Sequence, residues 1–330
     1  MKNLYNIALM DMNLQLFADM NTQTTGTASL SDEMKTFYSS YLIDNATPKL
    51  VHDQFGQKHP IPKNGGKTIE FRKYSPLPKM LTPLTEGVTP DGQSLTVSTI
   101  EATVEQYGGY ITISDVLQLT AIDNNMMQAT KLLGNQAGAT LDTITREVLN
   151  GGTNVIYSGG VSSRSAVADL PTVQDVKKAA RALKIQNAEK IGDSFVGIIH
   201  PDVSFDLTND PEWKEPHTYV DTEHMYSGEI GKIWGVRFVE TTEAKIFAGA
   251  GASGKSVYST LILADNAYGV TEVEGGGLQH IVKQLGSAGT ADPLNQRATV
   301  GWKAIKTAER LVEQFMVRIE SASTFDSEAN

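Results

Sequence analysis

Residues 67–72 read Lys-Thr-Ile-Glu-Phe-Arg, an alternation of polar and apolar side chains that is typical of a strand with one covered face. A segment rich in proline follows, and a return strand is predicted over residues 93–113. The apolar residues change phase between Val97 and Ile100, which predicts a bulge near residues 98–99. At about 3.3 Å per residue the return leg would span roughly 60 Å. A lone ribbon of two strands is marginal in water and exposes both edges, so we expect another surface to cover it.

The ribbon leads directly into a predicted helix over residues 114–150. Ser114 is a good N-cap, and Asn150-Gly151-Gly152 supplies the stop. Apolar residues recur every three or four positions between these ends: Leu119, Ile122, Met126, Ala129, Leu133, Ala137, Leu141, Ile144 and Val148. A helix of this length measures about 50 Å.

Two glycines lie on the apolar side of this helix and permit a close approach of another backbone. We therefore expect tight packing on a sheet or a second helix around Leu133, Gly134, Ala137, Gly138 and Leu141. The same glycine spacing occurs in membrane helices, but charged residues such as Asp142 and Arg146 interrupt this run.

The composition is that of an ordinary globular chain and excludes several classes of function. Of 330 residues, 40% are hydrophobic and 20% are charged, and the formal net charge is −10. This acidity argues against a dedicated DNA-binding protein. The absence of cysteine excludes disulfides and thiolate chemistry. No apolar run is long enough to cross a bilayer, so no contact with a membrane is expected.

The regions on either side of the ribbon and helix predict an α+β protein. Residues 1–30 resemble an arm that becomes ordered against a partner, and a helix is predicted over 31–47. A Gly/Ser-rich connection at 153–169 is a candidate domain boundary. Beyond it we predict helices at 172–184 and 201–209, a polar loop at 213–226, and strands at 194–199, 233–239, 245–248, 257–263, 268–273, 298–305 and 311–319.

Residues 249–256 read Gly-Ala-Gly-Ala-Ser-Gly-Lys-Ser, which satisfies the spacing of a phosphate-binding P-loop. That chemistry needs a helix after the loop, so that amide groups and the helix dipole face the phosphate. The residues that follow, 257–263, are β-branched and aromatic and predict a strand. Too few residues remain for a parallel crossover, so a flexible hairpin turn is the favoured interpretation.

The remaining polar clusters do not define a catalytic site. His217, Asp221 and His224 lie in one polar loop, and their spacing fits no common zinc site. Lys177, Lys178, Arg181 and Lys184 share one side of a predicted helix, where a solvated face is favoured over phosphate binding. Neither a GxSxG elbow nor an HExxH motif occurs. We therefore predict a non-enzyme with no catalytic residue, metal or cofactor.

Several segments resemble one family of proteins over nearly the whole chain. Residues 13–18 look like the start of many tailed-phage capsid proteins. Residues 84–87, 105–115, 233–238, 265–269 and 292–296 are similar to the major capsid family typified by coliphage N-four. The glycine-rich stretch at 249–256 is not part of that pattern.

This resemblance implies an α+β capsid fold of the Hong Kong 97 type. It implies an N-terminal arm with a helix (1–54), an extended β-hairpin loop (55–113), a spine helix of the peripheral domain (114–152), an axial domain (170–290) and C-terminal strands of the peripheral domain (291–330). The hairpin would lie across the spine helix and peripheral sheet of a neighbour. Charged residues near its tip are the expected contacts that set register: Arg72, Lys73, Lys79, Glu86 and Asp91.

The implied function is a major capsid protein that assembles into an icosahedral shell around double-stranded DNA. Its expected partners are further copies of itself in hexamers and pentamers, the portal, and scaffolding or decoration proteins. The packaged DNA would be held without specific contacts, and assembly would take place in the bacterial cytoplasm. The alternatives are a P-loop ATPase that uses residues 249–256, or a decoration or fibre protein of the virion.

Overall fold

The computed structural model describes residues 22–23, 51–62, 66–74, 77–89, 91–121, 125–214, 231–272, 276–287, 289 and 292–327. The chain divides into two compact units. Unit 1 comprises residues 1–42, 110–131 and 280–301, and unit 2 comprises residues 43–109, 132–279 and 302–330. Strand β5 (Glu105–Ser114), helix α3 (Asn125–Asn150) and strand β14 (Arg297–Arg310) each run from one unit into the other.

A seven-stranded sheet lies at the centre of unit 2, with strand order β6-β15-β11-β7-β9-β8 and β10 beside β11. Its strands are β6 (Val155–Tyr157), β7 (Phe195–Ile199), β8 (Lys232–Ile233), β9 (Val236–Glu240), β10 (Ile246–Phe247), β11 (Val257–Leu263) and β15 (Met316–Ser321). The sheet mixes parallel pairs, such as β7 with β9, and antiparallel pairs, such as β11 with β15. The expectation of a mixed α and β fold is confirmed.

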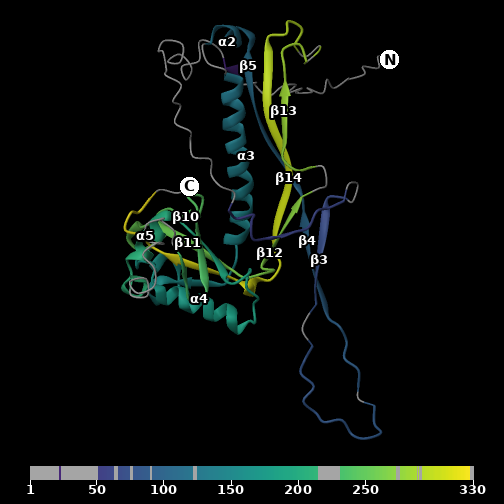
Figure 1. The fold of residues 1–330 in the computed structure, drawn as a ribbon, viewed down its shortest axis with the longest axis vertical. Coiled ribbons are helices and arrows are strands. Elements are labelled where there is room, and N and C mark those ends of the chain that lie inside the picture. The colour runs from purple at the N-terminus through teal and green to yellow at the C-terminus, as the bar shows by residue number, and fades with distance from the viewer. Residues whose placement is uncertain are drawn as a thin grey trace, which may run out of the picture. The chain divides into compact units, whose positions relative to one another are not determined.

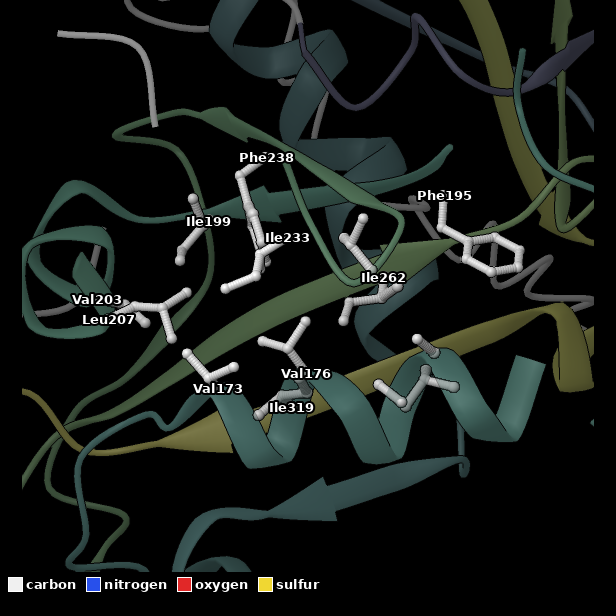
Figure 2. Packing of buried hydrophobic residues seen from close by; sticks show 14 of the residues in the cluster. Val173, Val176, Phe195, Ile199, Val203, Leu207, Ile233, Phe238, Ile262 and Ile319 are labelled. Atoms are coloured by element: carbon white, nitrogen blue, oxygen red, sulfur yellow. The ribbon is translucent and has the colours of Figure 1, made fainter. Parts of the chain in front are cut away.

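Helix α4 (Val173–Ile185) packs its apolar face on this sheet, and α5 (Pro201–Asn209) follows β7. Thr172 is the N-cap of α4, as its sequence predicts, because its side chain accepts a hydrogen bond from the amide of Asp175. Figure 2 shows Val173 and Val176 of α4 pointing toward Ile262 and Ile319 of the strands. This cluster is the main apolar core of unit 2.

A second sheet has strand order β1-β5-β14-β12-β2, with β13 beside β14. Besides β5 and β14, its strands are β1 (Thr22–Gln23), β2 (Gln57–Lys58), β12 (Tyr268–Glu272) and β13 (Gln279–Lys283). Strands β3 (Thr68–Tyr74) and β4 (Val97–Thr103) form a separate two-stranded sheet. Short 3-10 turns complete the elements: η1 (Ser158–Gly160), η2 (Arg164–Ala166), η3 (Ala252–Gly254) and η5 (Glu313–Phe315).

The prediction of one continuous helix over 114–150 is wrong. The Ser114 hydroxyl caps α2 (Asp115–Thr120) by accepting from the amide of Leu117 at 3.3 Å, but α2 ends at Ala121, whose ψ of 138° is extended. Thr120 and the Asp-Asn-Asn stretch at 123–125 have low helix propensity, which accounts for the break. Within unit 1, Ile113, Leu117 and Ala129 form a small core. No helix in the described part of the chain is both long enough and apolar enough to span a bilayer.

The predicted bulge at residues 98–99 is also wrong. Strands β3 and β4 keep one register from Thr68 opposite Thr103 to Tyr74 opposite Val97. The phase change in the sequence arises because Leu95 and Val97 are exposed, so neither has to face the covered side. The strand is interrupted instead at Val104, between β4 and β5. The amide of Val104 donates to the carbonyl of Lys67 at 2.9 Å.

Three other segments of unit 2 differ from expectation. The strand predicted at 233–239 is a β8–β9 hairpin that turns at Trp234 and Gly235, both with positive φ. Trp213 belongs to the buried core rather than to a polar loop. The two C-terminal strands are β14 and β15, so residues 311–315 leave the strand conformation. Strand β13 was not predicted, and the arm and helix expected before residue 50 lie outside the described residues apart from β1.

A buried polar cluster in unit 2 joins the segment before the hairpin to α3 and β14. The backbone amide and Nδ1 of His52 both contact the carboxylate of Asp142, at 2.8 and 2.6 Å. The next residue, Asp53, forms an ion pair with Lys306 and accepts a hydrogen bond from Thr145 at 2.5 Å. The Lys306 ammonium also donates to the carbonyl of Leu141 at 2.9 Å. These contacts fix residues 52 and 53 at the point from which the hairpin departs.

We expect Asp53→Ala to lower the free energy of unfolding by about 3 kcal/mol, because the buried Lys306 ammonium loses its counter-charge. Lys306→Met should cost far less, since it replaces the cation with an apolar side chain of similar length. Denaturant unfolding of the unassembled subunit measures both. Equal losses in the two variants would show that the ion pair does not determine stability here.

Candidate assembly interface

The β3–β4 hairpin and the loop that joins its strands (Figure 1) form the candidate interface. Among the described residues, β3 and β4 pair only with each other. The base of the hairpin is held by unit 2, because Ala102 and Val104 are buried and the Phe71 ring packs on Gly269. His59 contacts the same ring edge-on, with centroids 5.3 Å apart. The base is therefore anchored in its own chain.

The distal part of the hairpin has no such cover. Every described residue between 77 and 99 is exposed. Leu81 is 83% exposed and Leu84 is 75% exposed. Further large apolar side chains are exposed along the same loop and its flanking strands: Tyr74, Leu77, Met80, Val88, Leu95 and Val97. Contiguous exposed apolar surface of this kind marks a site of contact with another molecule.

The charged residues named from the sequence lie on this same surface. Lys73, Lys79, Glu86 and Asp91 are exposed, and within the described part of the chain no ion pair involves them. Arg72 pairs with Glu70 at 3.4 Å, but both side chains are well exposed, so this pair contributes little to stability. All five are available to a second molecule.

The residues named on α3 divide into two groups. Leu133, Ala137 and Leu141 are buried within the chain. Gly134 is exposed, and no atom lies within 4 Å of the place a Cβ would occupy, while Gly138 is half-buried. No described part of the chain therefore makes the close approach expected at Gly134, and its packing against another copy stays a prediction.

The glycine-rich stretch 249–256 is a hairpin connection and lacks the geometry of a P-loop. It joins β10 to the antiparallel β11, so no helix follows it. Its backbone amides already donate hydrogen bonds within the chain. The amide of Gly251 donates to the carbonyl of Lys255 at 2.9 Å, and the amide of Ala252 donates to the carbonyl of Val167 at 2.8 Å. These amides are not free to hold a phosphate, and the interpretation as a hairpin turn is confirmed.

Two histidines of the described chain have contacts within the subunit that account for them. His52 is part of the buried cluster, and His200 caps α5 by accepting from the amide of Asp202 at 3.2 Å. Burial lowers the pKa of His200, which favours the neutral ring that this acceptor role needs. No cluster of three metal-ligating side chains occurs in the described residues, and His217, Asp221 and His224 lie outside them.

Sequence reasoning missed two features of unit 2. Trp234 was assigned to a strand, yet it sits in a turn with its ring exposed beside the basic side of α4. The one signal for this turn in the sequence is that a glycine, Gly235, follows Trp234, since glycine often occurs in turns. The ion pair of Asp53 with Lys306 joins residues far apart in sequence, and no local pattern indicates it.

A family model described as phage capsid protein matches residues 97–308, which is more than half of the chain. This chain belongs to that family. It is a major capsid protein, and copies of it form the shell of a phage. A comparison with curated proteins finds no significant match.

Solved phage capsids have the same fold at low sequence identity. The capsid protein of Ralstonia phage GP4 aligns with a TM-score of 0.67 at 15% identity, covering 89% of this chain and 96% of the other. That of cyanophage P-SCSP1u aligns at 0.66 and 13% identity, covering 88% and 93%. That of cyanophage Pam1 aligns at 0.63 and 16% identity, covering 87% and 94%.

For this capsid protein, the exposed hairpin residues are expected to matter for assembly and not for folding. Leu81→Ser with Leu84→Ser should change the free energy of unfolding of the subunit by less than about 0.5 kcal/mol, because neither side chain is packed. Shell formation should fall strongly, since each leucine would forgo about 1.5–3 kcal/mol of burial. Denaturant unfolding and light scattering measure the two effects.

Thr82→Ala with Thr85→Ala is the matched control, because it changes neighbouring exposed polar residues and should leave shell formation intact. A serine variant that loses subunit stability but assembles normally would contradict the assignment of these leucines to the interface.

Proposed function

We propose that this chain is the major capsid protein of a tailed phage, similar to that of coliphage N-four, with a Hong Kong 97-type fold. Its copies form hexamers and pentamers in an icosahedral shell around double-stranded DNA. The portal, together with scaffolding or decoration proteins, completes the set of partners, and assembly takes place in the bacterial cytoplasm. The resemblance of segments along the chain supports this finer assignment.

The domain roles follow the same proposal. Residues 1–54 serve as the arm, 55–113 as the extended hairpin loop, and 114–152 as the spine helix of the peripheral domain. Residues 170–290 form the axial domain around each capsomer centre, and 291–330 supply the C-terminal strands of the peripheral domain. The net charge of −10 suits a shell that encloses DNA without specific contacts.

The observation that carries the mechanism is the exposed distal hairpin. It lies across the spine helix and peripheral sheet of a neighbouring copy, which covers Leu81, Leu84 and the other apolar side chains of the loop. The charged side chains of Arg72, Lys73, Lys79, Glu86 and Asp91 set the register of this contact, and Gly134 and Gly138 let backbones approach. Obligate interfaces of this type commonly bury about 2,000–5,000 Å².

Deletion of residues 75–92 tests the proposal. The shortened protein should fold, because its apolar cores contain none of the deleted residues. It should not form shells, because the covering contact is gone. Circular dichroism and electron microscopy of the purified protein measure folding and assembly.

Lys190→Ala is the matched control for this deletion, since it alters an exposed residue outside the hairpin and should assemble as wild type does. Normal shells from the deletion variant would overturn the proposed role of the hairpin. ATP hydrolysis by the wild type that Lys255→Ala abolishes would instead support the ATPase alternative.

A further inference from the structure

Unit 2 carries a hollow of about 420 Å³ on the outer side of α4, next to the β8–β9 turn. Its lining residues are Lys177, Ala180, Arg181, Lys184, Ile185 and Trp234. Ile185 and Trp234 are each 56% exposed. A concave, partly apolar surface of this size is large enough to receive aromatic side chains.

Trp234 is held in a conformation that costs free energy. Its φ of 51° lies in the left-handed region, which is unfavourable for residues other than glycine. The Lys177 ammonium lies 4.6 Å from the centre of its ring and pairs with Glu212 at 2.5 Å, so the indole is fixed in its exposed position. An immobilised, exposed tryptophan beside arginine is typical of the energetic centre of a protein interface.

Besides Lys177, which pairs with Glu212, two further cations line the hollow. Arg181 and Lys184 are exposed and form no ion pair with any described residue. They make a positive surface on a chain whose net charge is −10. The hollow therefore combines an apolar floor with a positive rim, which suits a ligand that is both aromatic and acidic.

A surface with those properties lies elsewhere on unit 2, where the C-terminal segment meets α5. Figure 1 places α5 and α4 on separate parts of this unit. The rings of Phe205 and Phe325 contact each other edge-on, with centroids 5.2 Å apart, and each side chain is about half exposed. We call Phe205, Phe325 and Asp326 the aromatic knob.

The knob is held rigidly. Asp206 accepts hydrogen bonds from the hydroxyls of Ser323 and Thr324, both at 2.7 Å, and this fixes the chain just before Phe325. Asp326 accepts from the amide of Ser256 at 2.6 Å. That hydrogen bond, with help from Lys255, lowers the pKa of Asp326 and keeps it ionised. A preorganised knob loses little entropy on docking.

We propose that the aromatic knob of one copy docks into the hollow of the next copy, with Asp326 facing Arg181 and Lys184. The two surfaces are different parts of the same chain, so the contact is head-to-tail and closes into a ring if the rotation between copies permits. This inference rests on the proposed function and specifies a contact around the capsomer centre. Nucleic acid is the less suitable occupant, because the exposed Trp234 and Ile185 contribute nothing to phosphate binding.

Cysteine crosslinking tests the contact cleanly, because the chain contains no cysteine. Gln186→Cys, next to Ile185 of the hollow, and Asn209→Cys, one helical turn after Phe205, are introduced together in the full chain, so that both docking surfaces stay intact. Assembled protein is then treated with a short bismaleimide. Denaturing electrophoresis should show a ladder that extends to the ring size. Each single variant should give dimers at most. A double variant that assembles but gives no species beyond the dimer overturns the inference.

Charge reversal supplies the second measurement and avoids changes to the apolar surfaces. In the double-cysteine background, Arg181→Glu with Lys184→Glu should reduce the ladder at least tenfold, whereas Lys190→Glu, at an exposed lysine outside the hollow, should not. If the ladder survives the charge reversal while the amount of packaged DNA falls, the hollow is a nucleic-acid surface and the inference is overturned. Wild-type protein that forms neither capsomers nor shells would instead contradict the proposed function.

Discussion

The proposed assembly depends on one constraint: the β3–β4 strand pair exposes leucines at its far end, and no described part of the chain covers them. Each large apolar side chain that moves from water into an interface contributes about 1.5–3 kcal/mol. Leu81, Leu84 and their neighbours gain nothing in the described chain, and the edges of β3 and β4 have no further strand beside them there. In the proposed function, a neighbouring copy in the shell covers these side chains.

A hairpin that reaches another molecule also needs a fixed origin. The buried contacts of His52 and Asp53 with α3 and β14 contribute to it, because they hold the chain in the segment that precedes β3. The packing of Phe71 on Gly269 does the same at the strand itself. A rigid base means that less conformational entropy is lost when the distal loop becomes ordered on a neighbour. Stability within the subunit and affinity between subunits are therefore separable properties of this chain.

Local sequence signals predicted much of the fold, and the failures have physical causes. Ser114 and Thr172 are N-caps as predicted, because capping depends on a few adjacent residues, although Ser114 caps the short α2 and not a helix that continues to residue 150. The bulge was predicted wrongly because the phase change was read as a change of covered face, whereas Leu95 and Val97 are exposed. The break at Ala121 and the turn at Trp234 were missed because apolar periodicity continues through both. The sequence predicted the exposed hairpin as the interface, and this stays a prediction, because the sequence of one chain gives no distances to another copy.

Hydrogen–deuterium exchange of the hairpin amides tests the central claim most directly, because it reports whether this backbone gains cover on assembly. Residues 77–99 are compared in unassembled subunits and in closed shells, with the buried strand β11 as the internal reference. We predict fast exchange of the hairpin in the subunit and at least tenfold slower exchange in the shell, with β11 slow in both. Equal exchange of the hairpin in the two states would contradict the claim that another copy covers it.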